Sequence, residues 1–177
     1  MNWSTEKKLK TVASLIEKDL KDLTVFVLDK PRHRGLVEEI HQAGARVTLY
    51  PAGDVAGAIM AAIPDTEVDV LMGTGGTPEG IISACAIRAM GGEFQGRINP
   101  QLATEIVSVR NAGFDTERWY ERDELIGSDD VHFCATGITS GLLFRGVKLT
   151  KHHFKTETLI VTGASKEQVS LTNWHNR

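Results

Sequence analysis

A glycine-rich turn near the middle of the chain has the residue types of a binding site. It reads Gly-Thr-Gly-Gly-Thr-Pro-Glu-Gly over residues 73–80, between an apolar segment at 68–72 and a helical pattern from Ile81. Glycines let the backbone approach a ligand closely, and the free N–H groups at a helix start attract anions. Glu79 adds a carboxylate, and Mg²⁺-type ions take oxygen ligands from carboxylates and phosphates together. The turn therefore indicates a metal ion between Glu79 and a bound phosphate.

Two common phosphate-binding loops do not match this turn. The dinucleotide fingerprint needs glycine at its first, third and sixth positions, and the sixth residue here is Pro78. The P-loop needs lysine after its last glycine, and Gly80 is followed by Ile81. A nucleotide site is therefore disfavoured. The alternative without function is an ordinary strand-to-helix connection whose glycines only permit a tight bend.

Polar residues also follow two earlier apolar segments. They are Asp29, Lys30, Arg32 and His33 after residues 24–28, and Gly53 and Asp54 after residues 46–50. In open parallel sheets, ligands bind beyond the carboxyl ends of the strands. Two cations and a helix start can hold a phosphate, and carboxylates from Asp29, Asp54 and Glu79 can hold a divalent metal. The positions therefore predict a site for a phosphorylated small molecule.

Each of these residues also has an interpretation that involves no ligand. Asp29 and Asp54 can instead cap the helices that follow them. Lys30 and Arg32 can be solvated surface charges. His33 is expected on the surface or on a helix, because no second metal-ligating residue stands at a suitable spacing.

The segments that must position these residues alternate between strand and helix patterns. Strands are predicted at 24–28, 46–50 and 68–72, and a first helix at about 5–20. A second helix carries Leu36, Val37 and Ile40 and ends before Gly44, a third carries the apolar residues of 55–63, and a fourth runs from Ile81 to near Gly91. After Gly96 follow a helix at 102–111 and antiparallel strands at 118–121, 131–135, 147–150 and 156–161. The first three strands are apolar enough to be buried on both faces, which is typical of parallel sheets with right-handed crossovers. We predict an α/β fold in one domain, residues 1–177, with a parallel βαβαβ part, later antiparallel strands and helices on both faces.

Composition excludes several classes of function. The chain has 177 residues, of which 41% are hydrophobic and 24% charged, as in an ordinary globular domain. A net charge of −3 without a basic stripe gives no reason to expect nucleic acid. The start is polar and no apolar run could span a bilayer, so no membrane partner and a cytoplasmic location are expected. Cys85 and Cys134 lie in apolar contexts and are expected to be buried, reduced thiols.

Several longer motifs occur along the chain in one order. They are Lys30-Pro31-Arg32-His33, Ala-Gly-Ala-Arg-Val at 43–47, Gly-Asp-Val-Ala at 53–56, Val-Asp-Val-Leu-Met-Gly at 68–73, Gly-Gly-Thr-Pro-Glu-Gly at 75–80 and Ala-Thr-Gly-Ile-Thr at 135–139. Together they closely resemble the class II fructose-1,6-bisphosphatases, including the bifunctional fructose/sedoheptulose bisphosphatases. The likeness extends from about Leu23 to the segment near Val161.

The resemblance implies a metal-dependent phosphatase of the lithium-sensitive, inositol-monophosphatase-like superfamily. Such enzymes convert fructose 1,6-bisphosphate to fructose 6-phosphate in gluconeogenesis, with Mn²⁺ or Mg²⁺. The resemblance implies substrate contacts at Lys30, Pro31, Arg32, Ala52, Gly53, Asp54 and Gly76. The first three would hold the phosphate that stays on the sugar. Glu79 would be a metal ligand, whereas the resemblance does not support Asp29 or Asp54 as ligands.

The resemblance also implies that part of the enzyme is missing. The family's other metal ligands, an Asp and a Glu followed by an Asp-Pro-x-Glu-Gly-Thr segment, lie in its N-terminal half and match nothing in residues 1–177. The chain is therefore expected to be the C-terminal half, without a catalytic residue of its own and inactive alone, because metal-assisted hydrolysis needs several carboxylates around one centre. The implied partners are a sugar bisphosphate and the N-terminal half or oligomer partners. The alternatives are a non-catalytic sugar-phosphate-binding or regulatory module, and an inert remnant with an exposed apolar surface.

Overall fold

The computed structural model describes residues 3–64 and 66–177, so the first two residues of the polar start lie outside it. The helices are α1 (Thr5–Leu15), α2 (Arg34–Ala43), α3 (Asp54–Ala62), α4 (Thr77–Met90), α5 (Ala103–Asn111) and α6 (Arg122–Leu125), with short 3₁₀ turns η1 (Leu20–Asp22) and η2 (Pro31–His33). The strands are β1 (Thr24–Leu28), β2 (Arg46–Tyr50), β3 (Val70–Leu71), β4 (Gln95–Gly96), β5 (Tyr120–Glu121), β6 (His132–Thr136), β7 (Lys148–Leu149), β8 (His153–Thr162) and β9 (Glu167–Asn176). The predicted mixed α/β class is confirmed.

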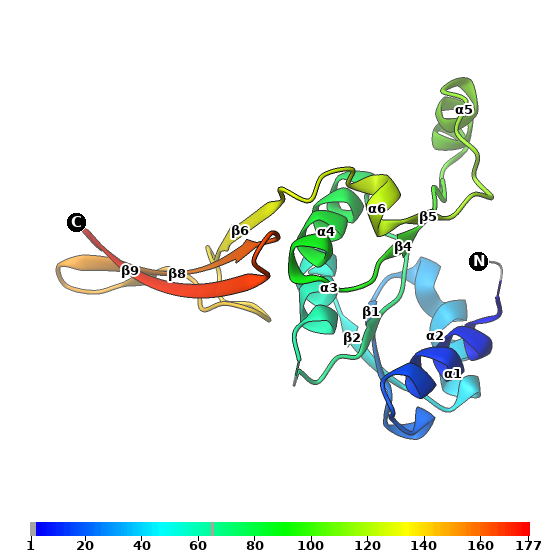
Figure 1. Ribbon diagram of the computed structural model, residues 1–177, viewed down its shortest axis with the longest axis horizontal. Coiled ribbons are helices and arrows are strands. Elements are labelled where there is room, and N and C mark those ends of the chain that lie inside the picture. Colours follow the sequence, from blue (N-terminus) through cyan, green and yellow to red (C-terminus); the bar gives the residue numbers. More distant parts are fainter. Residues whose placement is uncertain (1–2, 65) are drawn as a thin grey trace.

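The two larger sheets lie on opposite sides of a helical layer, and β4 and β5 form a separate two-stranded antiparallel sheet. The first is parallel with strand order β2-β1-β3. The second is antiparallel: β6 and β7 pair with one edge of β8, and β9 pairs with the other. Figure 1 shows α3 and α4 between the sheets and α1 and α2 on the far side of the parallel sheet. The helices therefore cover both faces of the parallel sheet, as predicted.

Strand β1 is the centre of the parallel sheet, and its side chains alternate between two apolar cores. Val25 and Val27 are buried with residues of α1 and α2, whereas Phe26 and Leu28 are buried on the side of α3. This alternation follows from the two-residue repeat of a strand. Strands β1 and β2 have the predicted bounds, but the third strand is shorter than predicted, since only Val70 and Leu71 pair with β1.

The first helix ends earlier than the sequence predicts. Leu9 and Ala13 are buried as expected, but α1 ends at Leu15 rather than near Leu20. Glu17 adopts a left-handed backbone conformation with φ of 54°, which cannot continue a right-handed helix. Leu20 then joins the same apolar cluster from the separate turn η1.

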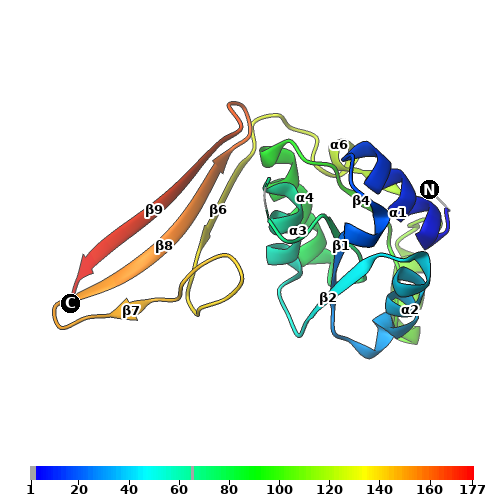
Figure 2. The same ribbon diagram turned by 90° about the horizontal axis from the view of Figure 1, so that it is seen from below.

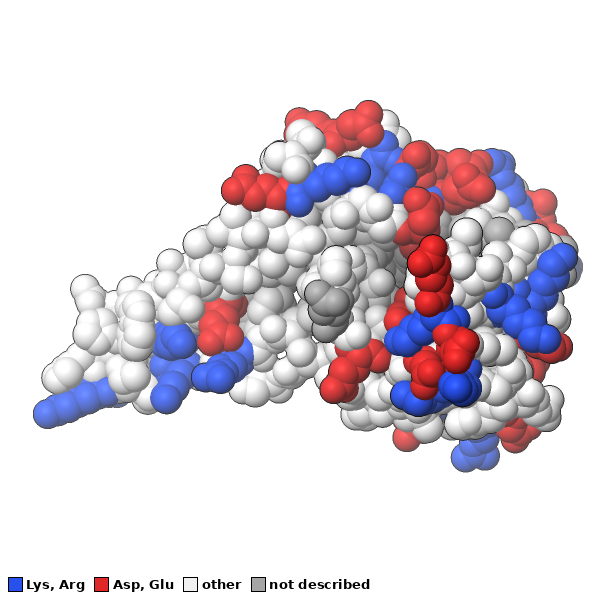
Figure 3. Space-filling model, turned by 60° about the horizontal axis from the view of Figure 1, so that its bottom comes forward, with Lys and Arg blue, Asp and Glu red and all other residues white. Residues whose placement is uncertain are grey.

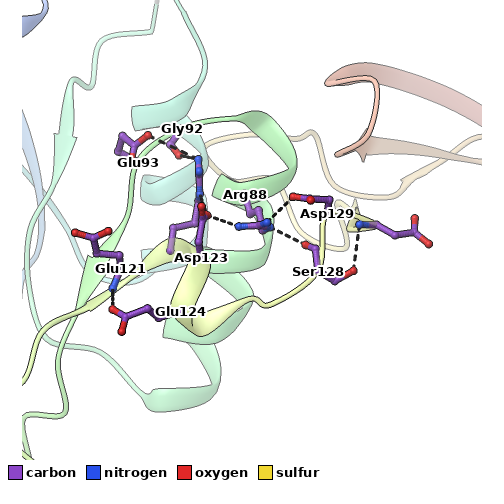
Figure 4. Close-up of polar contacts among 10 residues, drawn as sticks. Arg88, Gly92, Glu93, Glu121, Asp123, Glu124, Ser128 and Asp129 are labelled. Atoms are coloured by element: carbon purple, nitrogen blue, oxygen red, sulfur yellow. Dashed lines mark hydrogen bonds and ion pairs between the residues drawn. The ribbon is translucent and has the colours of Figure 1, made fainter.

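The antiparallel sheet is attached to α4 through a core and a polar network. Ala86, Ala89 and Met90 pack with Phe133 and Val161. Beside this core, the Arg88 guanidinium donates to the Ser128 carbonyl oxygen (2.6 Å) and the Asp129 carboxylate (2.5 Å), and also contacts Asp123 of α6 (Figure 4). Arg88 therefore holds α6 and the segment leading into β6 against the last turn of α4.

Arg122 completes this network from α6. Its Nε donates to the Asp123 carboxylate at 2.7 Å, and its Nη1 donates to the Gly92 carbonyl oxygen just beyond α4. The hydrogen bond from Arg122, together with the nearby charges of Arg122 and Arg88, holds the pKa of the Asp123 carboxyl below its ordinary value. Asp123 therefore stays ionised between two arginines.

Several large apolar side chains are exposed, among them Leu102, Ile106 and Val107 at α5. Helix α5 projects from the body and buries none of its residues (Figure 1). Cys134 on β6 is exposed and Cys85 is half-buried, so the expectation of two buried thiols is wrong. Cys134 falls on the face of β6 opposite the buried Phe133, because side chains alternate along a strand.

No helix in residues 3–64 and 66–177 is both long and apolar enough to cross a membrane.

Candidate functional site

The glycine turn between β3 and α4 contacts the segment that follows β1, mainly through Thr74. The Thr74 N–H donates to His33 Nε2 at 2.9 Å, and Arg32 Nε donates to the Thr74 carbonyl oxygen at 2.8 Å. Asn99 Nδ2 donates to Thr74 Oγ1 at 3.1 Å. The carboxyl ends of β1 and β3 therefore lie together, as expected for neighbouring parallel strands.

His33 lies inside this arrangement and not on its surface. Its side chain is only 3% exposed, and its Nδ1 lies 2.8 Å from the Leu28 carbonyl oxygen. Because Nε2 accepts the Thr74 N–H, we assign the ring proton to Nδ1, which then donates to Leu28. His33 is therefore not a surface histidine, but it does lie in a helical segment, at the end of η2 and at the N-cap of α2. Thr74 is 41 residues away along the chain, so spacing could not reveal this partner; only the place of His33 directly after Lys30, Pro31 and Arg32 pointed to the site.

The segment after β2 reaches the same turn through Asp54. Gly53 precedes α3 with φ of 103°, a left-handed conformation that favours glycine, and Asp54 is the first residue of α3. Asp54 Oδ1 accepts the Val55 N–H at 3.1 Å, and a Cβ atom added to Gly75 would lie 2.6 Å from Asp54 Oδ2. A side chain at position 75 would therefore displace the Asp54 carboxylate.

Neither aspartate proposed as a helix cap has that role. Gly53 is the N-cap residue of α3, so Asp54 belongs to the first helical turn, where its negative charge is favourable. Asp29 is exposed, and the N-cap residue of the following turn η2 is Lys30, without a side-chain capping hydrogen bond. The capping interpretation is therefore wrong for both residues.

Glu79 lies in the first turn of α4, next to the backbone of the glycine turn. Gly76 is the N-cap residue of this helix, and a Cβ atom added there would overlap the Glu79 carboxylate. Glu79 is exposed, and its negative charge near the helix N-terminus is stabilised by the backbone dipoles. The Gly76 backbone and the Glu79 carboxylate can therefore contact one ligand from the same side.

The remaining predicted site residues lie around this edge with side chains accessible to a ligand. Pro31, Arg32 and Ala52 are exposed, and Lys30 is half-buried. In the part of the chain that the structure describes, the Arg32 side chain forms no hydrogen bond other than the one from Nε to Thr74. Its Nη groups are therefore available for a planar anionic group such as a phosphate.

The residues that the structure describes do not form a complete metal centre. Among the described residues, no group of three or more His, Cys, Asp or Glu side chains could hold a metal ion. The expectation that Asp29, Asp54 and Glu79 form a three-carboxylate site is therefore wrong. Mg²⁺ and Ca²⁺ need about six or more oxygen ligands, of which the Glu79 carboxylate can supply only a small part. These residues by themselves do not fit a bound divalent ion.

Replacing His33 with alanine is expected to loosen the glycine turn. The change removes the acceptor of the Thr74 N–H and one of the donors to the Leu28 carbonyl oxygen, which keeps the Lys30 N–H. A buried unsatisfied polar group costs about 1–3 kcal/mol. Urea unfolding should therefore show lower stability, and amide exchange should show faster exchange at Thr74. His41→Ala, at an exposed position of α2, is the matched control and should change stability by less than about 0.5 kcal/mol. A Thr74 amide that stays protected in His33→Ala would contradict this role.

A parallel sheet with cationic side chains and a glycine turn at its carboxyl edge is typical of proteins that bind phosphorylated ligands. Comparison of the sequence with known protein families identifies one family within this class of phosphate-binding proteins. The family described as bacterial fructose-1,6-bisphosphatase, glpX-encoded, matches residues 1–175, and the chain belongs to this family. The resemblance stated from the motifs is therefore confirmed.

Two relatives show how much of the family's length the chain covers. It is 39% identical to a protein of Haemophilus influenzae named fructose-1,6-bisphosphatase class 2, over 99% of this chain and 56% of that protein. It is 37% identical to a protein of Synechococcus elongatus named D-fructose 1,6-bisphosphatase class 2/sedoheptulose 1,7-bisphosphatase, over 94% of this chain and 52% of that protein. The chain spans about half the length of the curated relatives it matches.

Proposed function

We propose that this chain is the substrate-binding part of a class II fructose-1,6-bisphosphatase. The observation that carries the proposal is the contact of Arg32 and His33 with Thr74, in the turn that leads to Glu79, within a chain that belongs to this family. The reaction is the hydrolysis of fructose 1,6-bisphosphate to fructose 6-phosphate, a step of gluconeogenesis, in the cytoplasm. Mn²⁺ or Mg²⁺ is the proposed cofactor.

Each site residue has a proposed role in binding. Lys30, Pro31 and Arg32 hold the phosphate that remains on the sugar, because Arg32 keeps its Nη groups available and Lys30 adds a second positive charge. The turn at Ala52, Gly53 and Asp54 and the backbone of Gly76 contact the sugar phosphate. Ala52 presents only a methyl group, so its side chain offers no polar contact to the sugar. Glu79 contributes one metal ligand.

The catalytic centre is completed by residues outside this chain. We propose that residues 1–177 form one α/β domain corresponding to the C-terminal half of the family, and that the N-terminal half supplies the remaining metal ligands. The two relatives leave room for such a half, since the chain covers 56% and 52% of their lengths. The absence of a three-ligand group among the described residues agrees with this division. Alone, the chain binds substrate and does not hydrolyse it.

Reconstitution with the N-terminal half of the Haemophilus influenzae relative tests this function. Phosphate release from fructose 1,6-bisphosphate with Mn²⁺ is expected only when both parts are present. In the mixture, Arg32→Ala should raise the substrate concentration needed by about 10–100-fold, since hydrogen bonds to charged groups contribute about 1.5–3 kcal/mol. Arg110→Ala on the projecting helix α5 is the control and should have no effect. A mixture that releases no phosphate while both parts are folded would argue against the proposal.

The second candidate function is a non-catalytic sugar-phosphate-binding module. It is favoured because the glycine turn and the Arg32 side chain contact each other, although the described residues form no group that could hold a metal ion. Calorimetry on the isolated chain with fructose 1,6-bisphosphate distinguishes the two functions. Tight binding without metal, together with no phosphate release in the reconstituted mixture, would support the module.

A further inference from the structure

The first part of the glycine turn is anchored at one residue, Thr74. In the sequence Gly-Thr-Gly-Gly over residues 73–76, only Thr74 has a side chain. Glycine has more backbone freedom than any other residue, so this stretch is not rigid by itself. Each hydrogen-bonding group of Thr74 has a partner: its N–H donates to His33, its carbonyl oxygen accepts from Arg32, and its hydroxyl oxygen accepts from Asn99. These bonds therefore restrain a turn that its glycines leave free.

The His33 ring connects Thr74 to the centre of the parallel sheet. Its Nε2 lies 2.9 Å from the Thr74 nitrogen and 3.2 Å from the Thr74 carbonyl oxygen, and its Nδ1 bonds Leu28 at the end of β1. A Cβ atom added to Gly73 would lie 3.1 Å from His33 Cε1, so the ring also packs against the turn. Figure 2 shows β1 between helices α3 and α4 on one side and α1 and α2 on the other. Thr74 is therefore tied to the most enclosed strand of this sheet.

Arg32 is bonded to a carbonyl oxygen, whereas several other arginines are bonded to carboxylates. Figure 3 shows acidic and basic side chains next to one another on the body of the molecule. Among the described residues, no carboxylate forms an ion pair with Arg32, and its Nε donates to Thr74 instead. This bond orients the guanidinium group and leaves its Nη groups and its charge for an anion. The arginines that do form ion pairs include Arg46, Arg88, Arg118 and Arg122.

We propose that His33 is a positioning residue for phosphate binding, which acts through Thr74 on Arg32. This inference rests on the proposed binding of a sugar bisphosphate at Arg32. The His33 ring is buried and both of its nitrogens are bonded, so it is not available to the ligand. An arginine side chain has many conformations, and holding it in place beforehand removes part of the entropy cost of binding. His33 therefore raises the affinity for the sugar bisphosphate without taking part in its hydrolysis.

Two substitutions separate the two hydrogen bonds of the His33 ring. Asparagine has an amide nitrogen in place of Nδ1 and can still donate to Leu28, but it has no acceptor in place of Nε2 for the Thr74 N–H. Glutamine is one carbon longer, and its amide oxygen can accept that N–H. Calorimetry of the chain with fructose 1,6-bisphosphate should show binding weakened by about 2–10-fold in His33→Asn, the cost of ordering one long side chain. His33→Gln should bind nearly as tightly as the unmodified chain. The matched control is His41→Asn, at an exposed position of α2, which should bind unchanged.

A double-mutant cycle tests whether His33 acts through Arg32. In the Arg32→Ala background, His33→Asn should cause no further loss of affinity, because the side chain that His33 positions is gone. In the mixture with the N-terminal half, His33→Asn should raise KM and leave kcat unchanged, as expected when only substrate binding is weakened. An equal loss of affinity in both backgrounds, or a fall in kcat with KM unchanged, would overturn the proposal. Either result would mean that the whole turn is disturbed and not Arg32 alone.

NMR of the arginine side chains tests the positioning without a ligand. In the unmodified chain, the Arg32 Nε–H should exchange with water more slowly than the Nε–H of the exposed Arg34. His33→Asn should speed this exchange, and His33→Gln should not. Equal exchange at Arg32 and Arg34, or no response to His33→Asn in a variant with unchanged circular dichroism, would also overturn the proposal. If exchange follows these expectations but the chain does not bind fructose 1,6-bisphosphate, the proposed function is contradicted while the positioning of Arg32 stands.

Discussion

Replacing Gly57 with alanine is expected to destabilise the protein by about 2 kcal/mol, although alanine is favoured over glycine in helices by about 1 kcal/mol. A Cβ atom at Gly57 would lie 2.6 Å from two ring carbons of Phe26 and 2.8 Å from Leu71 Cδ1. Phe26 is fully buried and stacks on Tyr50 with ring centroids 4.8 Å apart, so its ring cannot move aside. Over-packing of this kind costs about 1–3 kcal/mol. The clash therefore outweighs the gain in helix propensity, and valine at the same position should cost more.

Urea unfolding of a matched pair of variants measures this effect. Gly35→Ala is the control, because Gly35 is also helical and a Cβ atom there meets nothing within 4 Å. That change should stabilise the protein by about 0.5–1 kcal/mol through the lower entropy of the unfolded chain. If both variants shifted stability in the same direction, the close packing of α3 on β1 would not be what limits position 57.

Replacing Glu79 with glutamine is expected to abolish most of the activity of the reconstituted enzyme. Glutamine keeps the shape of the side chain but removes its charge, and the proposed role of Glu79 depends on that charge. Loss of groups that only support a metal ligand typically costs 10–100-fold in metal affinity or activity, so loss of a ligand should cost about 100-fold or more. Phosphate release should fall by this factor, and more Mn²⁺ should be needed for half of the remaining activity.

A control on α2 separates the role of Glu79 from a general effect of charge. Glu38 is exposed, and Glu38→Gln makes the same change in net charge away from the glycine turn. It should leave phosphate release unchanged. Calorimetry with fructose 1,6-bisphosphate should show that Glu79→Gln still binds the sugar bisphosphate, because Lys30 and Arg32 are intact. Full activity in the Glu79 variant would remove Glu79 from the proposed metal site.

The parallel half of the fold could be predicted from sequence because its signals are local. Thr24–Leu28 is almost wholly apolar, and Gly44 follows α2 with φ of 93°, as a helix-ending glycine should. The last strand was not predicted. Five of its ten residues are Ser, Thr, Asn or Gln, and both faces are largely exposed. Polar and apolar residues alternate only over 168–172, and Trp174 then falls on the opposite face from Leu171, so the strand has no single apolar face. Its stability comes from pairing with β8, which the local sequence does not show.

The candidate site was only partly predictable for a similar reason. Parallel strands bring their carboxyl ends to one edge, so the approach of residues after β1, β2 and β3 follows from topology alone. Which side chains are then in contact depends on residues that are far apart along the sequence. His33 reaches Thr74, and Asp54 lies against Gly75, but Asp29 joins no group of metal-ligating residues in the described chain. Spacing along the sequence carries no information about such long-range contacts.

Helix α4 connects the glycine turn at one end to the antiparallel sheet at the other. Its first turn carries Glu79, and its last turn carries Arg88. The Arg88 guanidinium donates hydrogen bonds to Ser128 and Asp129, in the segment leading to β6. Fourteen residues of α-helix span about 21 Å, and a helix of this length moves nearly as a rigid rod. A small tilt of α4 at the glycine turn would therefore also displace its last turn. The antiparallel sheet, which is attached there, would move with it.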